Sequence, residues 1–180
     1  PEPLDPAQID HLLRTVAHAP TGKNTRRCLF TLVEDRATMD ELRRRTLEGL
    51  RRAVQERRLG SELGYFRHVV AAWDQGRDII FRDAPHLLTV SVPRTVTTAD
   101  ADMVIALTCF ELLAAATGIG TLWNAMIKWA FSQIDEDLYA ALGVPDDHVR
   151  GTFMIFGMPE VCYHRTVLRD DYQLNRVRLI

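Results

Sequence analysis

The sequence predicts an α+β fold in which helices wrap a central mixed sheet. Long helical patterns separate short strand-like runs, and the helices carry recognisable start and stop signals. The 180 residues are 47% apolar and 26% charged, which suits one globular domain with a substantial core. We therefore expect residues 1–180 to form a single domain. Because the chain begins at Pro1 with the approach to a helix, we also expect that it is trimmed at its N-terminus.

The first predicted helix begins after Asp5, which is an N-cap acceptor followed directly by a proline. Apolar residues then recur at helical spacing until Pro20 ends the pattern. Residues 20–24 follow as a loop. Residues 28–34, rich in Phe, Thr, Leu and Val, predict a strand.

Two further helices are expected between residues 38 and 74. Thr38 and Glu41 have the spacing of a capping box and would open a long, arginine-rich helix that ends near Gly60. Residues 62–74 place aromatic and branched side chains on one helical face. That face is suited to core packing, to walling a pocket or to meeting another subunit.

The second half of the chain begins with a predicted strand at residues 87–92. Carboxylates at positions 100 and 102 favour a helix N-terminus, and residues 103–117 are apolar almost all round, which predicts a helix buried on every side. Gly118 is suited to end it in the left-handed conformation. Residues 120–124 then continue as a strand or extended loop.

The last part of the chain predicts a short helix, a third buried strand and an irregular tail. Ser132 and Asp135 precede the helix, which runs to Leu142 and is broken by a Gly-Val-Pro sequence. The strand covers residues 149–156. No internal repeat or low-complexity segment is present.

Charge and composition argue against several classes of partner. The net charge of -2 and the absence of a basic tract do not favour nucleic acid. The most apolar stretch, residues 103–116, contains Glu111 and is too short to span a bilayer, so we expect no membrane segment. Three widely spaced cysteines, Cys28, Cys109 and Cys162, fit a reducing, cytoplasmic location.

Several kinds of catalytic site are poorly supported by the motifs. The six histidines lack the spacing of metal ligands, so no metal site is expected. There is no Gly-x-Ser-x-Gly elbow, Walker loop or complete Gly-x-Gly-x-x-Gly fingerprint. Hydrolase, nucleotide triphosphatase and Rossmann dehydrogenase chemistry are therefore not indicated.

An ordered set of short motifs does point to a family. Along the chain lie Ala-Pro-Thr-Gly-Lys-Asn at 19–24, Asp-Ala-Pro at 83–85, Gly-Ile-Gly-Thr-Leu-Trp at 118–123 and Phe-Gly-Met-Pro at 156–159. In order and spacing this set resembles the FMN-dependent nitroreductase family over nearly the whole chain. The resemblance implies a mainly antiparallel α+β homodimer with FMN at the dimer interface. It also implies that the chemistry takes place on the flavin, so no catalytic side chain is expected.

The resemblance assigns cofactor contacts to the loop that contains Pro20, Thr21, Lys23 and Asn24. A cation close to the ring stabilises a reduced flavin, which carries negative charge on its pyrimidine end, and Lys23 is the candidate. Thr21 and Asn24 have side chains that suit hydrogen bonds to the ring. By residue type alone, a solvated surface turn is the simpler interpretation.

A second set of contacts is implied for Thr121, Leu122, Trp123 and Asn124, whose backbone would lie along the ring. The alternative is that the nearby glycines only end a helix and that Trp123 belongs to the core. In the tail, Arg165 resembles the basic residue that reaches the FMN phosphate, because a guanidinium binds phosphate oxygens in pairs.

Two departures from the family pattern bear on the flavin site. The family usually opens with an Arg-x-Ser-x-Arg segment that holds the phosphate, and the sequence begins just downstream of its expected place. Arg26 and Arg27 also stand where many relatives have Gln-Pro. Arg26 would add positive charge beside the flavin or favour an anionic substrate, or would point to solvent.

The function expected from the resemblance is an oxidoreductase in which FMN passes electrons from NADH or NADPH to a nitroaromatic, quinone or similar small acceptor. A ferredoxin-type donor, in a ferredoxin-like module upstream, is a second version. Two other hypotheses remain open: a flavin-binding or flavin-handling protein without nicotinamide turnover, and a dimeric scaffold that has lost FMN.

Overall fold

The computed structural model describes residues 2–60, 64–133, 137–161, 164 and 173–179. In the described chain, four strands form one sheet in the order β1-β2-β4-β3, and every neighbouring pair is antiparallel. The predicted α+β class and the mainly antiparallel sheet are therefore confirmed. The strands are β1 (Leu29–Val33), β2 (His86–Pro93), β3 (Gly120–Asn124) and β4 (His148–Gly157).

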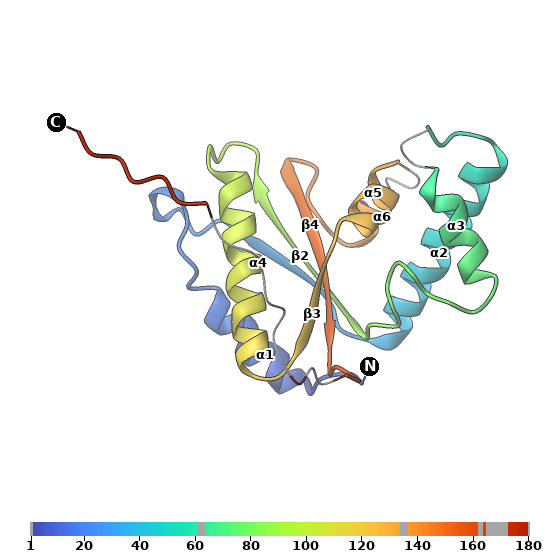
Figure 1. Cartoon of the computed structure of the whole chain (residues 1–180), viewed down its shortest axis with the longest axis horizontal. Helices are drawn as coiled ribbons and strands as arrows, with labels where there is room; N and C mark the ends of the chain where they lie inside the picture. Colours follow the sequence, from blue (N-terminus) through green and yellow to red (C-terminus); the bar gives the residue numbers. More distant parts are fainter. Residues whose placement is uncertain (1, 61–63, 134–136, 162–163, 165–172, 180) are drawn as a thin grey trace.

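Helices cover both faces of the sheet (Figure 1), and a separate apolar core lies on each side. One face carries α1 (Pro6–Val16) and α4 (Ala99–Ala116). The other carries α2 (Arg36–Gln55), α3 (Tyr65–Trp73), α5 (Ala125–Gln133) and α6 (Asp137–Ala141). The central strands β2 and β4 are buried along most of their length because both of their faces are covered.

The start of α1 follows the local signals of the sequence. The Asp5 carboxylate accepts a hydrogen bond of 2.8 Å from the Ala7 amide, and Pro6 occupies the first helical position, where no amide donor is needed. Ile9, Leu12 and Val16 are buried against the sheet. The helix ends at Val16, four residues before the proline at position 20.

The start and the end of α2 both differ from the sequence prediction. The N-cap is Asp35, whose carboxylate accepts the Thr38 amide at 2.8 Å, so Thr38 lies inside the helix and does not cap it. Asp35 has extended backbone angles that suit a cap. At the other end, Arg57 adopts a positive φ of 55° directly after the C-cap residue, which ends the helix at Gln55 without a glycine.

The aromatic face of α3 is mostly core. Phe66 and Val69 are buried, and Val70 and Trp73 pack against the same cluster; only Tyr65 is exposed. This confirms core packing and removes that face as an argument for a partner subunit. The next helix of this layer, α5, was not predicted. It begins directly after Asn124, whose side-chain oxygen accepts the Ile127 amide at 3.0 Å and so caps it.

The prediction that α4 is buried on every side is wrong for the single chain. Val104 is 53% exposed and Leu112 is 66% exposed, and Thr108 lies between them at the same helical spacing. We call Val104, Thr108 and Leu112 the α4 stripe. No helix in the described part of the chain is long and apolar enough to cross a membrane.

Candidate functional site

The loop after α1 has an unusual backbone. Lys23 and Asn24 have φ angles of 53°, and Arg26 has a φ of 52°. Residues with a side chain rarely adopt this left-handed conformation, and such residues cluster at functional sites. Two contacts with Arg26 organise the loop: the Thr21 hydroxyl accepts its amide at 3.0 Å, and the Asn24 side-chain oxygen accepts its Nε at 3.1 Å.

The same loop leaves polar groups free for a ligand. Lys23 is exposed and has no ion-pair partner among the described residues. The Thr25 hydroxyl is buried and, in this part of the structure, makes no hydrogen bond. The loop thus exposes a cation, which fits a flavin that carries negative charge when reduced, and holds an unsatisfied hydroxyl beneath it.

Contacts with the start of α4 hold this loop in place. The Gly22 amide donates to Asp102 Oδ1 at 2.8 Å, and Thr98 Oγ1 donates to Asp102 Oδ2 at 3.1 Å. A Cβ atom on Gly22 would lie 2.2 Å from Thr98 Oγ1, so only glycine fits at this position. These contacts span 80 residues of sequence and were not anticipated by the sequence analysis.

A small cavity of about 160 Å³ lies beside this loop. Thr21 and Arg26 contribute to its wall, together with apolar side chains of α1, β1 and α4. Two of the predicted cofactor-binding residues therefore share a concave surface. Pro20 lies at the entry to the loop and is exposed.

The second predicted segment forms β3, an edge strand that pairs only with β4 in the described sheet. Its side chains are largely committed within the protein. Trp123 is half-buried and its indole donates to Glu111 Oε2 at 2.7 Å, whereas Asn124 is buried and its side-chain amide donates to the Ile80 carbonyl at 2.6 Å. Leu122 is exposed and Thr121 half-buried, so the backbone and these two side chains are what β3 can offer a ligand.

One chain does not bring the two predicted segments together. The loop is held by Asp102, whereas Trp123 is held by Glu111, which lies nine residues further along α4. This corresponds to roughly 13 Å of helix rise. In the single chain the two predicted segments thus lie against different turns of α4.

The other family motifs pack against one another at one end of the sheet. A Cβ atom on Gly157 would lie 2.6 Å from Pro85 Cδ, and one on Gly120 would lie 3.2 Å from Pro159 Cβ. Glycine is thus needed for close packing in this cluster. Gly118, with a φ of 78°, ends α4 as predicted. The side chain of Trp123 is partly buried against the core on the α1 and α4 side of the sheet.

His86, the first residue of β2, ties the N-terminal segment to this end of the sheet. Its Nε2 accepts the Leu4 amide at 2.8 Å, so Nδ1 carries the ring proton and donates to the Glu34 carbonyl at 2.9 Å. The ring is almost fully buried. Burial lowers the pKa of His86 below its ordinary value, against the opposing effect of the Glu34 carbonyl.

We expect the protein to lose stability as the pH falls below about 6.5, because the unfolded chain then takes up a proton that folded His86 excludes. The stabilisation is complete above that pH and decreases with a slope approaching about 1.4 kcal/mol per pH unit. Urea titrations across this range measure it. The slope should shrink in His86→Gln and persist in His11→Gln, whose side chain is exposed. Equal slopes in His86→Gln and the unmodified protein would show that another group is responsible.

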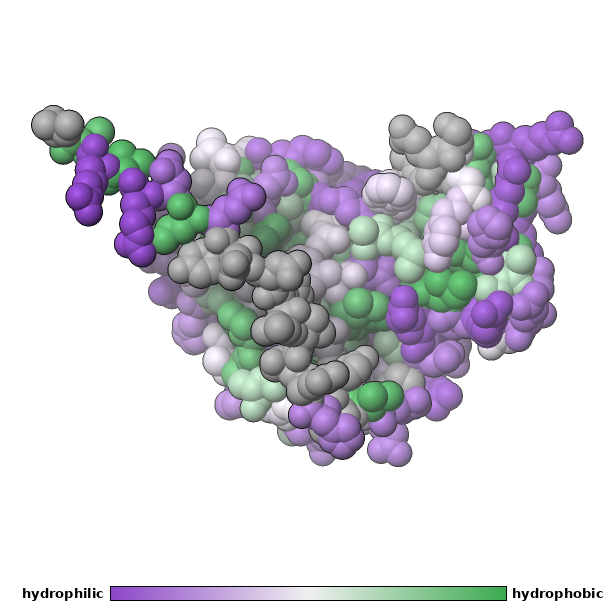
Figure 2. Space-filling model, viewed as in Figure 1, coloured by the Kyte–Doolittle hydropathy of each residue, from purple (hydrophilic) through white to green (hydrophobic). Residues whose placement is uncertain are grey.

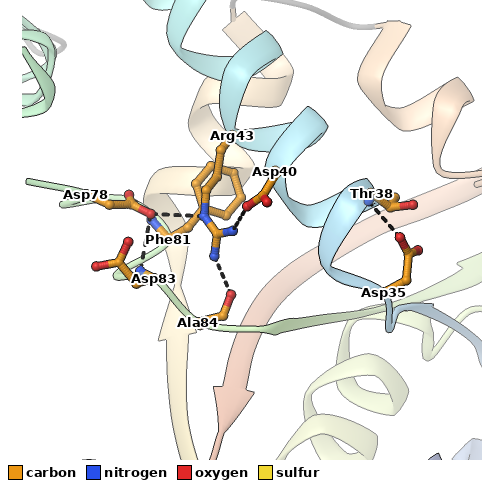
Figure 3. Close-up of polar contacts among 8 residues, drawn as sticks. All are labelled: Asp35, Thr38, Asp40, Arg43, Asp78, Phe81, Asp83 and Ala84. Atoms are coloured by element: carbon orange, nitrogen blue, oxygen red, sulfur yellow. Dashed lines mark hydrogen bonds and ion pairs between the residues drawn. The ribbon is translucent and has the colours of Figure 1, made fainter. Parts of the chain in front are cut away.

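A buried ion pair between α2 and the segment before β2 was also not predicted from the sequence (Figure 3). Arg43 donates to Asp78 at 3.2 Å and to Asp40 at 2.7 Å, and it also donates to the Ala84 carbonyl. The same Asp78 carboxylate accepts the Phe81 amide at 2.8 Å. This network fixes the segment that leads into β2. Nothing in the residue types marks Arg43 apart from the other arginines of the helix.

Part of the predicted tail contact lies outside the described residues. Arg165, the candidate phosphate ligand, belongs to this part. His164 is described and exposed. Among the residues that are described, no group of three His, Cys, Asp or Glu side chains is placed to hold a metal ion.

Comparisons with known proteins agree on one family. Residues 1–158 match the sequence model of the nitroreductase family. A nitroreductase with bound FMN from Bacteroides fragilis NCTC 9343 is 20% identical, with a TM-score of 0.74 over 97% of this chain and 90% of that one. A nitroreductase with bound FMN from Desulfitobacterium hafniense DCB-2 is 19% identical, with a TM-score of 0.71 over 93% of this chain and 85% of that one.

A third similar structure holds a nicotinamide. The FMN-dependent nitroreductase NfnB from Mycobacterium smegmatis, in complex with NADPH, is 21% identical, with a TM-score of 0.59 over 88% of this chain and 80% of that one. No curated protein is a significant match. At these identities the structural likeness establishes the fold.

Proposed function

Because this chain belongs to the nitroreductase family and is thus a flavin-dependent oxidoreductase, we propose that it carries electrons on FMN from NADH or NADPH to a nitroaromatic, a quinone or a similar acceptor. Bound FMN would supply the hydride and electron-transfer chemistry between the nicotinamide and the acceptor. The observation that carries the proposal is the loop at residues 20–26, with its left-handed backbone, free cation and unsatisfied hydroxyl. The similar structures that contain FMN support it.

The residues of this chain bind and orient the flavin. Lys23 supplies positive charge next to the reduced ring, and Thr21 and Asn24 contribute hydrogen bonds from the same loop. Pro20 sets the entry to the loop, and Arg26 adds a second cation at its exit. The β3 backbone at residues 121–124 would contact the flavin ring, and Arg165 would bind its phosphate.

We further propose that the site is completed in a homodimer. The α4 stripe leaves two large apolar side chains exposed in the single chain. The C-terminal tail, residues 173–179, projects away from the body and alternates hydrophobic with hydrophilic residues (Figure 2). A second copy would cover both surfaces and would bring a loop from one copy to β3 of the other. Light scattering that shows only monomers would contradict this arrangement.

Anaerobic reduction of the flavin tests the proposed function. The protein is expected to bind FMN, and the bound flavin to lose its visible absorbance on addition of NADH or NADPH and to recover it on addition of a nitroaromatic or quinone. Absorbance spectra under argon measure both steps, and free FMN at the same concentration is the control. Bound flavin that bleaches with dithionite but with neither nicotinamide would indicate a flavin-handling protein or a ferredoxin-type donor. A protein that does not bind FMN, even with the residues upstream of Pro1 restored, would leave only the scaffold hypothesis.

A further inference from the structure

Asp102 is a buried carboxylate that the proposed function does not use. Its side chain is 2% exposed, lies in the first turn of α4 and has no cationic partner among the described residues. Its two oxygens accept only the Gly22 amide and the Thr98 hydroxyl. Burying an unpaired charge is costly, although the positive end of the α4 dipole offsets part of the cost. A charge kept under these conditions calls for a role beyond packing.

The position of Asp102 connects it to the left-handed loop. Its hydrogen bond holds the amide of Gly22, the residue immediately before Lys23 and Asn24. Those two residues adopt a conformation that is unfavourable for side-chain-bearing residues, so the loop needs an external anchor to keep its shape. Asp102 and Thr98 are that anchor, and Thr98 lies too close to Gly22 to admit a side chain there.

The charge of Asp102 also acts on this region. Cys28, directly before β1, has a raised pKa because its thiol is partly buried and because the Asp102 carboxylate disfavours a nearby thiolate. Because Asp102 Oδ1 lies 2.8 Å from the Gly22 amide, its negative charge also acts on an anion bound beside this loop. It therefore opposes Lys23, which lies on the exposed side of the same loop.

We propose that Asp102 is a positioning residue for the flavin loop and that its charge disfavours the anionic reduced flavin relative to the oxidised one. The inference rests on the proposed function, since it places FMN beside residues 21–24. Lys23 and Asp102 then form an opposed pair: one stabilises negative charge on the ring and the other limits that stabilisation. Together they set how readily the bound flavin gives up its electrons.

The Asp102→Asn variant tests both parts of this role. Asparagine keeps an acceptor for the Gly22 amide but removes the charge. We expect the ratio of the dissociation constants of oxidised and reduced FMN to shift roughly tenfold in favour of the reduced form. We also expect the Gly22 amide to exchange its hydrogen roughly tenfold faster, because a neutral acceptor binds it less strongly. FMN titrations in both redox states and amide hydrogen exchange measure these changes.

Two further variants separate charge from structure. Asp100→Asn removes an exposed carboxylate from the same helical turn and should change neither quantity. Thr98→Val leaves the Asp102 charge in place but removes one of its hydrogen bonds, so it should speed exchange at Gly22 without altering the redox ratio. An unchanged ratio in Asp102→Asn, or an equal shift in Asp100→Asn, would overturn the electrostatic role.

The proposed function and this inference fail in different ways. If the unmodified protein does not bind FMN, the proposed function is wrong, and with it the electrostatic role. The exchange of the Gly22 amide still tests the anchor in that case, because it needs no cofactor. Unchanged exchange in both Asp102→Asn and Thr98→Val would overturn the positioning role.

Discussion

Replacing Arg43 with leucine should lower the free energy of unfolding by about 3–5 kcal/mol. The substitution leaves the Asp78 carboxylate, 3% exposed, without its cation and removes the donor to the Ala84 carbonyl. An uncompensated buried charge costs far more than a lost surface contact. Urea denaturation followed by circular dichroism at neutral pH measures the loss.

Arg44, the next residue of α2, provides a matched control. It pairs with Glu41 and Glu48, but all three side chains are about half exposed, so Arg44→Leu should change stability only slightly. Combining Arg43→Leu with Asp78→Asn should recover part of the stability, since the stranded charge is then gone. If Arg43→Leu lowered the free energy of unfolding no more than Arg44→Leu, the Arg43 network in Figure 3 would not contribute to stability.

The Gly22→Ala substitution should weaken FMN binding by about 10- to 100-fold while leaving the fold intact. Its Cβ atom would overlap Thr98, so the loop has to move away from α4 and carry Lys23 and Asn24 with it. Because the loop is on the surface, we expect little change in the melting temperature. A fluorescence titration of FMN measures the affinity.

Gly60→Ala is the control for this substitution. Gly60 has no atom within 4 Å of its would-be Cβ and no positive φ, so the added methyl group should leave FMN binding unchanged. Gly22→Ala with full affinity for FMN would place the flavin elsewhere than beside this loop.

Local sequence signals predicted most of the elements because those signals act over a few residues. Three examples are the N-cap Asp5, the β-branched and aromatic residues of β1, and the left-handed Gly118. Each of these signals depends only on neighbours in the sequence. The α5 helix was not predicted because its N-cap, Asn124, is also the last residue of β3 and fits the strand pattern. The α2 cap was misplaced by three residues, since Asp35 and Thr38 both have capping side chains.

Partners distant in the sequence were beyond prediction for a different reason. The order of motifs picked out the loop at residues 20–26, but not the carboxylate that holds it, because Gly22 and Asp102 meet only in the folded chain. The apolar composition of α4 predicted complete burial, yet the single chain leaves Val104 and Leu112 exposed. Composition predicts an apolar helix, but it does not determine which of its faces the rest of this chain covers.

The strand order has a consequence for how this protein is made. The last strand, β4, lies between β2 and β3, so those two earlier strands have no common neighbour until residues 148–157 have left the ribosome. Pairing β4 with β2 also closes a loop of more than fifty residues, which slows folding. We expect nascent chains that stop before β4 to remain open and in need of chaperones, whereas assembly becomes cooperative once that strand is inserted.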